Sequence, residues 1–281
     1  MASIFNFSTL NTILDSKTRS ITVELNRPDL WNAINFEMMF ELESLLSWCA
    51  SHMEINTILL TSRLEFLSKG FDYNEFLKTP DHKIQKYLIK FQKLIHSMFF
   101  LPQTILIDLR HGAIGAAAEL AIGADIRFAH EQSSIHFNHL DMGLIPACGG
   151  VGFLSTVIPK STAKNWVLSS QPITMNELIS SGFIYKSYTD ETIIKTQMKK
   201  ISEQSPVARI QAKRSMLESI IPDLEHAMEY EKNFAFGAMY AEDWKRSIKA
   251  KLEGKKPEFI SAMEFKDILK THKKLNVTAE N

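Results

Sequence analysis

The stretch from Arg110 to Leu120, RHGAIGAAAEL, has the residue types and spacing best suited to chemistry. Its two glycines permit a tight turn, and the alanines then begin a helix. The first N–H groups of a helix have no partner within it, and the helix dipole makes that end positive. We therefore expect the Ala116 N–H to stabilise an oxyanion and Glu119, on nearly the same face, to transfer a proton. The alternative is a packing motif whose alanines let the helix approach a sheet closely.

A second candidate is the loop Leu67–Asp72, LSKGFD, between an expected strand and an expected helix. Gly70 permits an unusual backbone angle at its centre. The Lys69 N–H could then serve as a second donor to the same anion. By itself the segment is an ordinary turn.

A third candidate lies at residues 136–150, HFNHLDMGLIPACGG. His139 can act as an acid or a base near neutral pH, and Asp141 could orient it. The alternative is that His136 and His139 are ordinary polar residues at the end of a strand. Their spacing fits no strong metal-binding pattern, so we expect no metal. Cys148 is expected to be a small buried residue and not a nucleophile.

Strands and helices alternate over the first 205 residues, which predicts an α/β core with parallel strand pairing. Alternating apolar and polar residues indicate strands, and apolar residues three or four apart indicate helices. Strands are expected at residues 21–25, 57–61, 104–109, 124–129 and 134–137, and helices at residues 35–52, 82–100, 115–124 and 151–157.

The composition changes near Ser205, and helix-forming residues dominate from there to about Leu252. Helices are expected over residues 224–240 and from residues 242–243 onward. We therefore divide the chain into a core, residues 1–205, and a helical region, residues 206–281. The helical region is expected to pack on the core or on another subunit.

The overall composition excludes several classes of protein. Hydrophobic residues make up 45% of the 281 positions and charged residues 23%, so extensive disorder is excluded. Thirty-two basic residues balance thirty-two acidic ones, so no global field would attract nucleic acid. We expect no signal peptide and no membrane span, because no apolar run is long enough. Two cysteines cannot form a disulfide framework, which favours a reducing, cytosolic setting.

Five segments, taken in order, resemble the crotonase superfamily, also called the enoyl-CoA hydratase/isomerase superfamily. They are LNRPDLWNAIN, FLSKGFDYNEF, HGAIGAAAELAIGADIRFA, IHFNHLDMGLIPACGG and WKRSIKAKLEGKKPEF. The similarity extends over about residues 12–259. It implies a crotonase-like spiral of ββα units with a C-terminal helical trimerisation region, and thus a homotrimer or a dimer of trimers.

The resemblance also implies an acyl-CoA substrate, with coenzyme A entering as part of that substrate and no separate cofactor. The thioester oxygen would be held by the N–H groups of Lys69 and Ala116. Glu119 would be the first catalytic glutamate, and His139 lies where the second is usual. Possible contacts to the substrate or its CoA moiety are Arg27, Leu30, Ser68, Gly70, Asp72, Gly115, Asp141 and Phe259.

The chain departs from the family pattern at several of these positions. His139 replaces the second glutamate, and Asn138 replaces the proline before it. Ala116 replaces a glycine of the oxyanion hole, Lys69 replaces an alanine, and Leu30 stands where a basic residue often contacts CoA phosphates. Imidazole and carboxylate both move protons, so a Glu119–His139 pair could still perform acid–base chemistry.

Three functions are consistent with this sequence. The leading hypothesis is hydration of a 2-enoyl-CoA, or a shift of its double bond, through a thioester enolate. Decarboxylation or hydrolysis of an acyl thioester would use the same oxyanion hole. A CoA-binding homologue without activity is the third. Nucleic-acid binding is not expected, because the first long helix carries Glu37, Glu41 and Glu43 where RNA-binding relatives have lysines.

Overall fold

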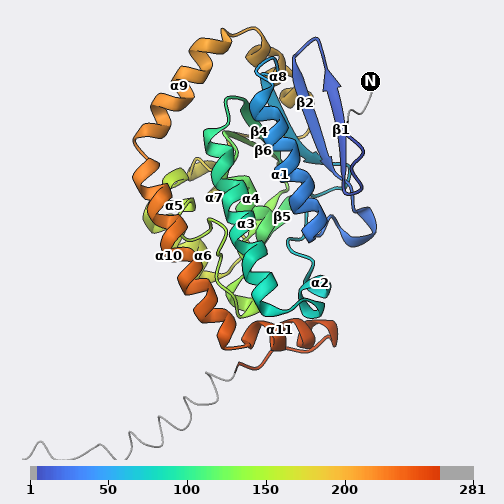
Figure 1. Ribbon diagram of the computed structural model, residues 1–281, viewed down its shortest axis with the longest axis vertical. Coiled ribbons are helices and arrows are strands. Elements are labelled where there is room, and N and C mark those ends of the chain that lie inside the picture. The colour runs from blue at the N-terminus through green and yellow to red at the C-terminus, as the bar shows by residue number, and fades with distance from the viewer. Residues whose placement is uncertain (1–4, 260–281) are drawn as a thin grey trace, which may run out of the picture.

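A mostly parallel sheet forms the centre of the computed structural model, which describes residues 5–259 (Figure 1). Its strand order is β1–β2–β3–β4–β6–β8, and every neighbouring pair except β1–β2 is parallel. A smaller sheet pairs β5 with β7 in parallel. The strands are β1 (Leu10–Asp15), β2 (Ser20–Leu25), β3 (Thr57–Ser62), β4 (Thr104–Asp108), β5 (Gly112–Ile114), β6 (Ile126–His130), β7 (Ser134–His136) and β8 (Lys186–Tyr188).

Helices surround the sheet, with α1 and α3 side by side and α9, α10 and α11 along the rim of the molecule (Figure 1). Asn35 caps α1 by accepting from the Met38 N–H, which fixes where this helix begins. The helices are α1 (Phe36–Ser51), α2 (Tyr73–Lys78), α3 (Asp81–Phe100), α4 (Ala116–Ile122), α5 (Leu154–Val157), α6 (Lys160–Ser169), α7 (Met175–Ser180), α8 (Thr192–Ser202), α9 (Pro206–Glu218), α10 (Ile221–Tyr240) and α11 (Asp243–Leu252).

The two faces of the main sheet are covered differently. Successive residues of β4 alternate between them: Ile105 and Ile107 join the large core beneath α1, α3 and α10, whereas Leu106 joins a smaller cluster against α8. Both faces are therefore buried, which explains why β3 and β4 read as continuous apolar runs.

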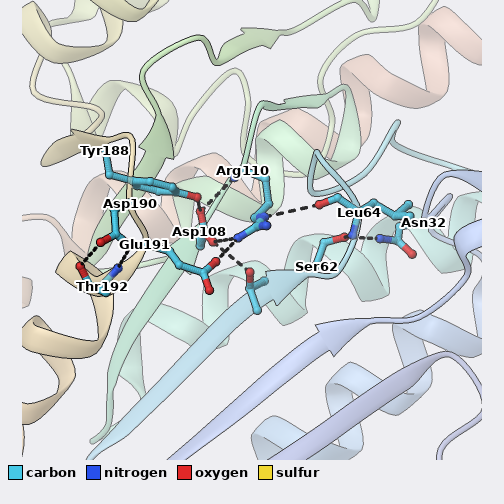
Figure 2. Close-up of polar contacts among 10 residues, drawn as sticks. Asn32, Ser62, Leu64, Asp108, Arg110, Tyr188, Asp190, Glu191 and Thr192 are labelled. Carbon is cyan, nitrogen blue, oxygen red and sulfur yellow. Dashed lines mark hydrogen bonds and ion pairs between the residues drawn. The ribbon is translucent and has the colours of Figure 1, made fainter.

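A polar cluster around Asp108 links strands β3, β4 and β8 to one another and to the start of α8 (Figure 2). The Asp108 carboxylate accepts from the Tyr188 hydroxyl at 2.6 Å, the Thr61 hydroxyl at 3.1 Å and the Arg110 backbone N–H at 3.0 Å. The Arg110 guanidinium also contacts Asp108 at 3.4 Å and reaches Glu191 at 2.5 Å. Burial and the neighbouring Asp108 raise the pKa of Tyr188, so its hydroxyl remains a donor.

The predicted alternation of strands and helices is confirmed within residues 5–259, and the expected elements differ from the observed ones mainly at their ends. The structure also contains elements for which no range was expected, namely β1, β5, β8, α2, α6, α7 and α8. The helix expected at residues 151–157 is only the short α5, because a turn that includes Gly149, Gly150 and Gly152 precedes it. The division after residue 205 stays a prediction, although α9 does begin at Pro206. Across the described chain, no helix has both the length and the apolar character needed to cross a membrane.

Candidate active site

Glu119 lies in the first turn of α4, where its carboxylate is buried and paired on both oxygens. Oε1 accepts from the Cys148 N–H at 2.8 Å and the Gly150 N–H at 3.1 Å. Oε2 lies 3.0 Å from His139 Nε2. Glu119 and His139 are only 1% and 3% exposed, so this carboxylate and imidazole meet away from bulk water.

The hydrogen bond to Glu119 indicates which ring nitrogen of His139 carries the proton. An ionised carboxylate can only accept a hydrogen bond, so we place the proton of the neutral imidazole on Nε2. Nδ1 then carries the free electron pair, and it has no hydrogen-bond partner among residues 5–259. The two side chains thus form one hydrogen-bonded carboxylate–imidazole pair.

An enclosed apolar cavity of about 20 Å³ adjoins this pair. It is large enough for about one water molecule, so an acyl chain can enter only if lining side chains move. Helices α10 and α11 close one side of it. Its lining residues are Phe71, Phe76, Ile84, Leu88, Glu119, His139, Leu144, Ile145, Ala147, Cys148, Ala235, Met239 and Trp244.

Of the two N–H groups expected to hold the substrate oxygen, that of Ala116 is free among residues 5–259 and that of Lys69 is not. The Lys69 N–H donates to the Trp31 carbonyl at 3.2 Å and is therefore not free to hold a substrate, which corrects that expectation. Among residues 5–259, the N–H groups of Phe71 and Ala116 have no acceptor. The loop that contains Phe71 passes close to the start of α4 at Gly70. A Cβ on Gly70 would lie only 3.3 Å from Ala116 N. Phe71 also lines the cavity, so Phe71 and Ala116 are the better candidates.

Two glycines set this backbone geometry. Gly70 has φ +92°, and a Cβ there would lie only 2.7 Å from the Ile114 carbonyl oxygen. Gly115 has φ +56° and precedes the first residue of α4. Both conformations favour glycine, so these positions are tied to the turn that exposes the Ala116 N–H.

The expectation that Asp141 orients His139 is wrong. The Asp141 carboxylate is about half exposed and lies 3.8 Å from His136 Nε2. His136 itself contacts the Ser170 carbonyl at 2.8 Å. Glu119, 20 positions earlier in the chain than His139, provides the contact that Asp141 was expected to make.

Most of the other predicted contact residues shape the loops around the site. Arg27 and Asp72 form an ion pair at 3.0 Å, and Asp72 caps α2. The Ser68 hydroxyl accepts from the Gly70 N–H at 3.1 Å. Leu30 is partly exposed, and Phe259, the last residue described, follows α11 and is absent from the cavity lining.

Two titratable groups near Glu119, the partly buried Tyr73 and the fully buried Glu231, were not foreseen from the sequence. Burial and the charge of Glu119 raise the pKa of Tyr73, which keeps its phenol protonated. Burial raises the pKa of Glu231 on α10 to about 7. Glu231 interrupts a stripe of buried residues at helical spacing, and that interruption was a readable signal. The stripe is Leu224, Ala227, Glu231, Ala235 and Met239.

Cys148 is buried, as predicted. Its side chain is fully buried, and burial together with the charge of Glu119 raises the pKa of the thiol well above its ordinary value. A thiol that stays protonated is a poor nucleophile. Cys148 contributes through its backbone N–H instead.

A family model described as "Enoyl-CoA hydratase/isomerase" matches residues 16–262. The chain belongs to this enoyl-CoA hydratase/isomerase family. One relative is the short-chain-enoyl-CoA hydratase of Clostridium acetobutylicum, 25% identical over 254 residues that cover 88% of this chain and 97% of the relative. Another is the 1,2-epoxyphenylacetyl-CoA isomerase of Escherichia coli K12, 24% identical over 85% of this chain and 94% of that protein.

Solved structures of family members share this fold. The crystal structure of an enoyl-CoA hydratase from Mycobacterium avium subsp. paratuberculosis K-10 has a TM-score of 0.81 at 17% identity, covering 90% of this chain and 99% of the other. An enoyl-CoA hydratase/isomerase from Pseudoalteromonas atlantica T6c has a TM-score of 0.79 at 21% identity, with 90% and 100% covered. The predicted family and its crotonase-like fold are both confirmed.

Proposed function

We propose that this enoyl-CoA hydratase/isomerase family enzyme acts on a 2-enoyl-CoA thioester by acid–base chemistry at the Glu119–His139 pair. The observation that carries the proposal is the combination of that buried pair, the adjoining apolar cavity and the unpaired amides of Phe71 and Ala116. Coenzyme A takes part as a portion of the substrate. The named relatives support hydration or isomerisation and give no support to decarboxylation or hydrolysis.

In this mechanism the thioester carbonyl oxygen accepts from the N–H groups of Phe71 and Ala116. These donors stabilise the negative charge that develops on that oxygen in an enolate. The positive end of α4, where Ala116 lies, adds to this stabilisation.

The pair moves the protons. In hydration, the oxygen of a water molecule bonds to the β-carbon, the pair removes one proton from that water, and the pair returns one proton to the α-carbon. In isomerisation, the pair removes a proton from the γ-carbon and delivers one to the α-carbon as the double bond moves. Both reactions are balanced, and neither requires an oxidant.

A steady-state assay with a panel of 2-enoyl-CoA thioesters tests this proposal. We expect turnover of at least one chain length, and a loss on the order of 10²-fold or more in Glu119→Gln with CoA binding retained. Glu229→Gln, at an exposed glutamate of α10, is the matched control. Full activity in Glu119→Gln would contradict the proposal.

We also propose that the protein is a homotrimer or a dimer of trimers. Large apolar side chains are exposed on α9 and α10, and burial of such surface between subunits would stabilise an assembly. Examples are Val207, Met216, Phe234 and Tyr240, with exposed fractions of 68%, 75%, 70% and 79%. Light scattering should give three or six times the 32.1 kDa chain mass, and a monomer would contradict the proposal.

A further inference from the structure

The loop Cys148–Gly152 lies between two buried glutamates. Glu119 Oε1 accepts from the N–H groups of Cys148 and Gly150. Glu231 Oε1 accepts from the next two N–H groups, those of Val151 at 3.1 Å and Gly152 at 2.5 Å. One short segment is thus held from opposite ends by the candidate catalytic carboxylate and by a carboxylate of α10.

Close packing makes this segment sensitive to the position of α10. A Cβ on Gly152 would lie 2.3 Å from the Cβ of Ala227, one helical turn before Glu231. A Cβ on Gly150 would lie 2.4 Å from Pro146. Because the loop fills the space on both sides, a shift at the α10 end must displace the N–H groups that hold Glu119.

Glu231 is itself fixed on its other oxygen. Oε2 accepts from the Gln92 side chain of α3 at 2.7 Å, and Glu231 is fully buried. The carboxylate therefore accepts three hydrogen bonds, from two loop amides and one side-chain amide. A carboxyl group can accept all of these, whereas an apolar side chain can accept none.

We propose that Glu231 is a positioning residue for Glu119. By accepting from Val151 and Gly152, it holds the loop in the register in which Cys148 and Gly150 fix the Glu119 carboxylate against His139. This inference rests on the proposed function, because it takes Glu119 as an acid–base group. The position of the Glu231 oxygen, and not its charge, performs this role.

The charge of Glu231 has a separate influence that the test must distinguish. The titratable groups that face Glu231 are Glu119 from α4, Cys148 from the loop and Tyr230 from α10 itself. After burial, the charge of Glu119 is a further cause of the raised pKa of Glu231. Two variants separate charge from position.

Glu231→Gln removes the charge and keeps an acceptor oxygen at the same distance along the side chain. Glu231→Asp keeps the charge and withdraws the oxygens from the loop by one methylene. We expect Glu231→Gln to keep kcat within about threefold, and Glu231→Asp to lose roughly tenfold or more in kcat with KM unchanged. Both are measured in the full chain on a 2-enoyl-CoA, normalised to folded protein by circular dichroism.

Glu229→Gln and Glu229→Asp make the same changes at an exposed site of α10 and should leave kcat unchanged. Wild-type kcat in folded Glu231→Asp, or a larger loss in Glu231→Gln than in Glu231→Asp, would overturn the inference. Glu119→Gln separates the two proposals. If it abolishes turnover while Glu231→Asp does not, only the role of Glu231 fails; if it remains active, the proposed function fails.

Discussion

Two buried carboxylates in this molecule are paired in different ways. Asp108 accepts from hydroxyls, a backbone N–H and a guanidinium, and the Arg110 side chain supplies a compensating charge (Figure 2). Glu119 accepts from two backbone N–H groups and the His139 imidazole, and no Lys or Arg of residues 5–259 is among its hydrogen-bond partners. Both side chains are almost completely buried.

The surroundings of the two carboxylates differ even more. The guanidinium bonded to Asp108 is also paired with Glu191 and contacts the Leu64 carbonyl. Beside Glu119, His139 Nδ1 and Asn138 Oδ1 lack partners among the described residues, and so do the N–H groups of Phe71 and Ala116. An unpaired buried polar atom costs about 1–3 kcal/mol, so unpaired atoms that gather at one place indicate a ligand site. Burial alone therefore does not mark a catalytic carboxylate.

Replacing each carboxylate by its amide should give opposite results. Glu119→Gln should lower turnover on the order of 10²-fold or more, since the acid–base group is lost. Asp108→Asn should lower the free energy of unfolding by about 1–3 kcal/mol, because hydrogen bonds around Arg110 are weakened, and should leave turnover near wild type. Enoyl-CoA turnover and urea denaturation measure the two effects. The contrast fails if Asp108→Asn loses as much turnover as Glu119→Gln.

The two histidines of the same segment sharpen the contrast. His139→Gln should lower kcat on the order of 10²-fold, because glutamine cannot exchange a proton with Glu119. His136→Gln should keep most of the activity, since among residues 5–259 the His136 imidazole pairs with the Ser170 carbonyl and with Asp141, not with Glu119. Steady-state kinetics of both variants decide the point, and equal losses would remove the special role of His139.

Glu231 predicts a pH dependence of stability. Its pKa is raised from 4.5 to about 7, so between these values the folded chain keeps a proton that the unfolded chain has released. Raising the pH through this window therefore destabilises the fold, by roughly 3 kcal/mol at most. Glu231→Gln should flatten the stability curve between pH 4.5 and 7 in urea titrations. A difference in unfolding free energy between variant and wild type that stays constant from pH 4.5 to 7 would contradict the raised pKa of Glu231.

The smallest expected effects come from two glycine substitutions. Together they separate the cost of backbone strain from the cost of a close contact between atoms. Gly70→Ala and Gly182→Ala both place alanine at positive φ, but only Gly70 has neighbours within 4 Å. Gly182→Ala should cost about 1–2 kcal/mol from strain alone. Gly70→Ala should cost more and should also lower kcat, because its Cβ would push on Ile114 beside Ala116. Equal losses of stability in the two variants, with kcat unchanged, would show that the close contact between Gly70 and Ile114 does not affect catalysis.

Local patterns were enough to predict much of the fold and the position of Glu119. Helical spacing placed α1 and α3 nearly residue for residue, and the glycine–alanine run placed Glu119 in the first turn of α4. These features depend on neighbours a few positions apart. The alternation of strands and helices likewise predicted the parallel sheet.

The errors concern contacts between distant segments. Which loop N–H is free depends on the Trp31 carbonyl, which takes the Lys69 N–H across a gap of 38 positions. Asp141 is near His139 in sequence, yet the imidazole turns to Glu119. Glu231 meets its loop partners about 80 positions away. Sequence spacing carries no information about such pairings without the fold.

Whether the N–H groups of Phe71 and Ala116 hold the thioester oxygen can be measured directly. The method is isotope-edited infrared spectroscopy of a bound 2-enoyl-CoA labelled with carbon-13 at the thioester carbonyl. Donation from the N–H groups of Phe71 and Ala116 polarises that bond, so the carbonyl stretch should move to lower frequency on binding, in both wild type and Glu119→Gln. A carbonyl band that stays at its solution frequency in the bound complex would contradict the account.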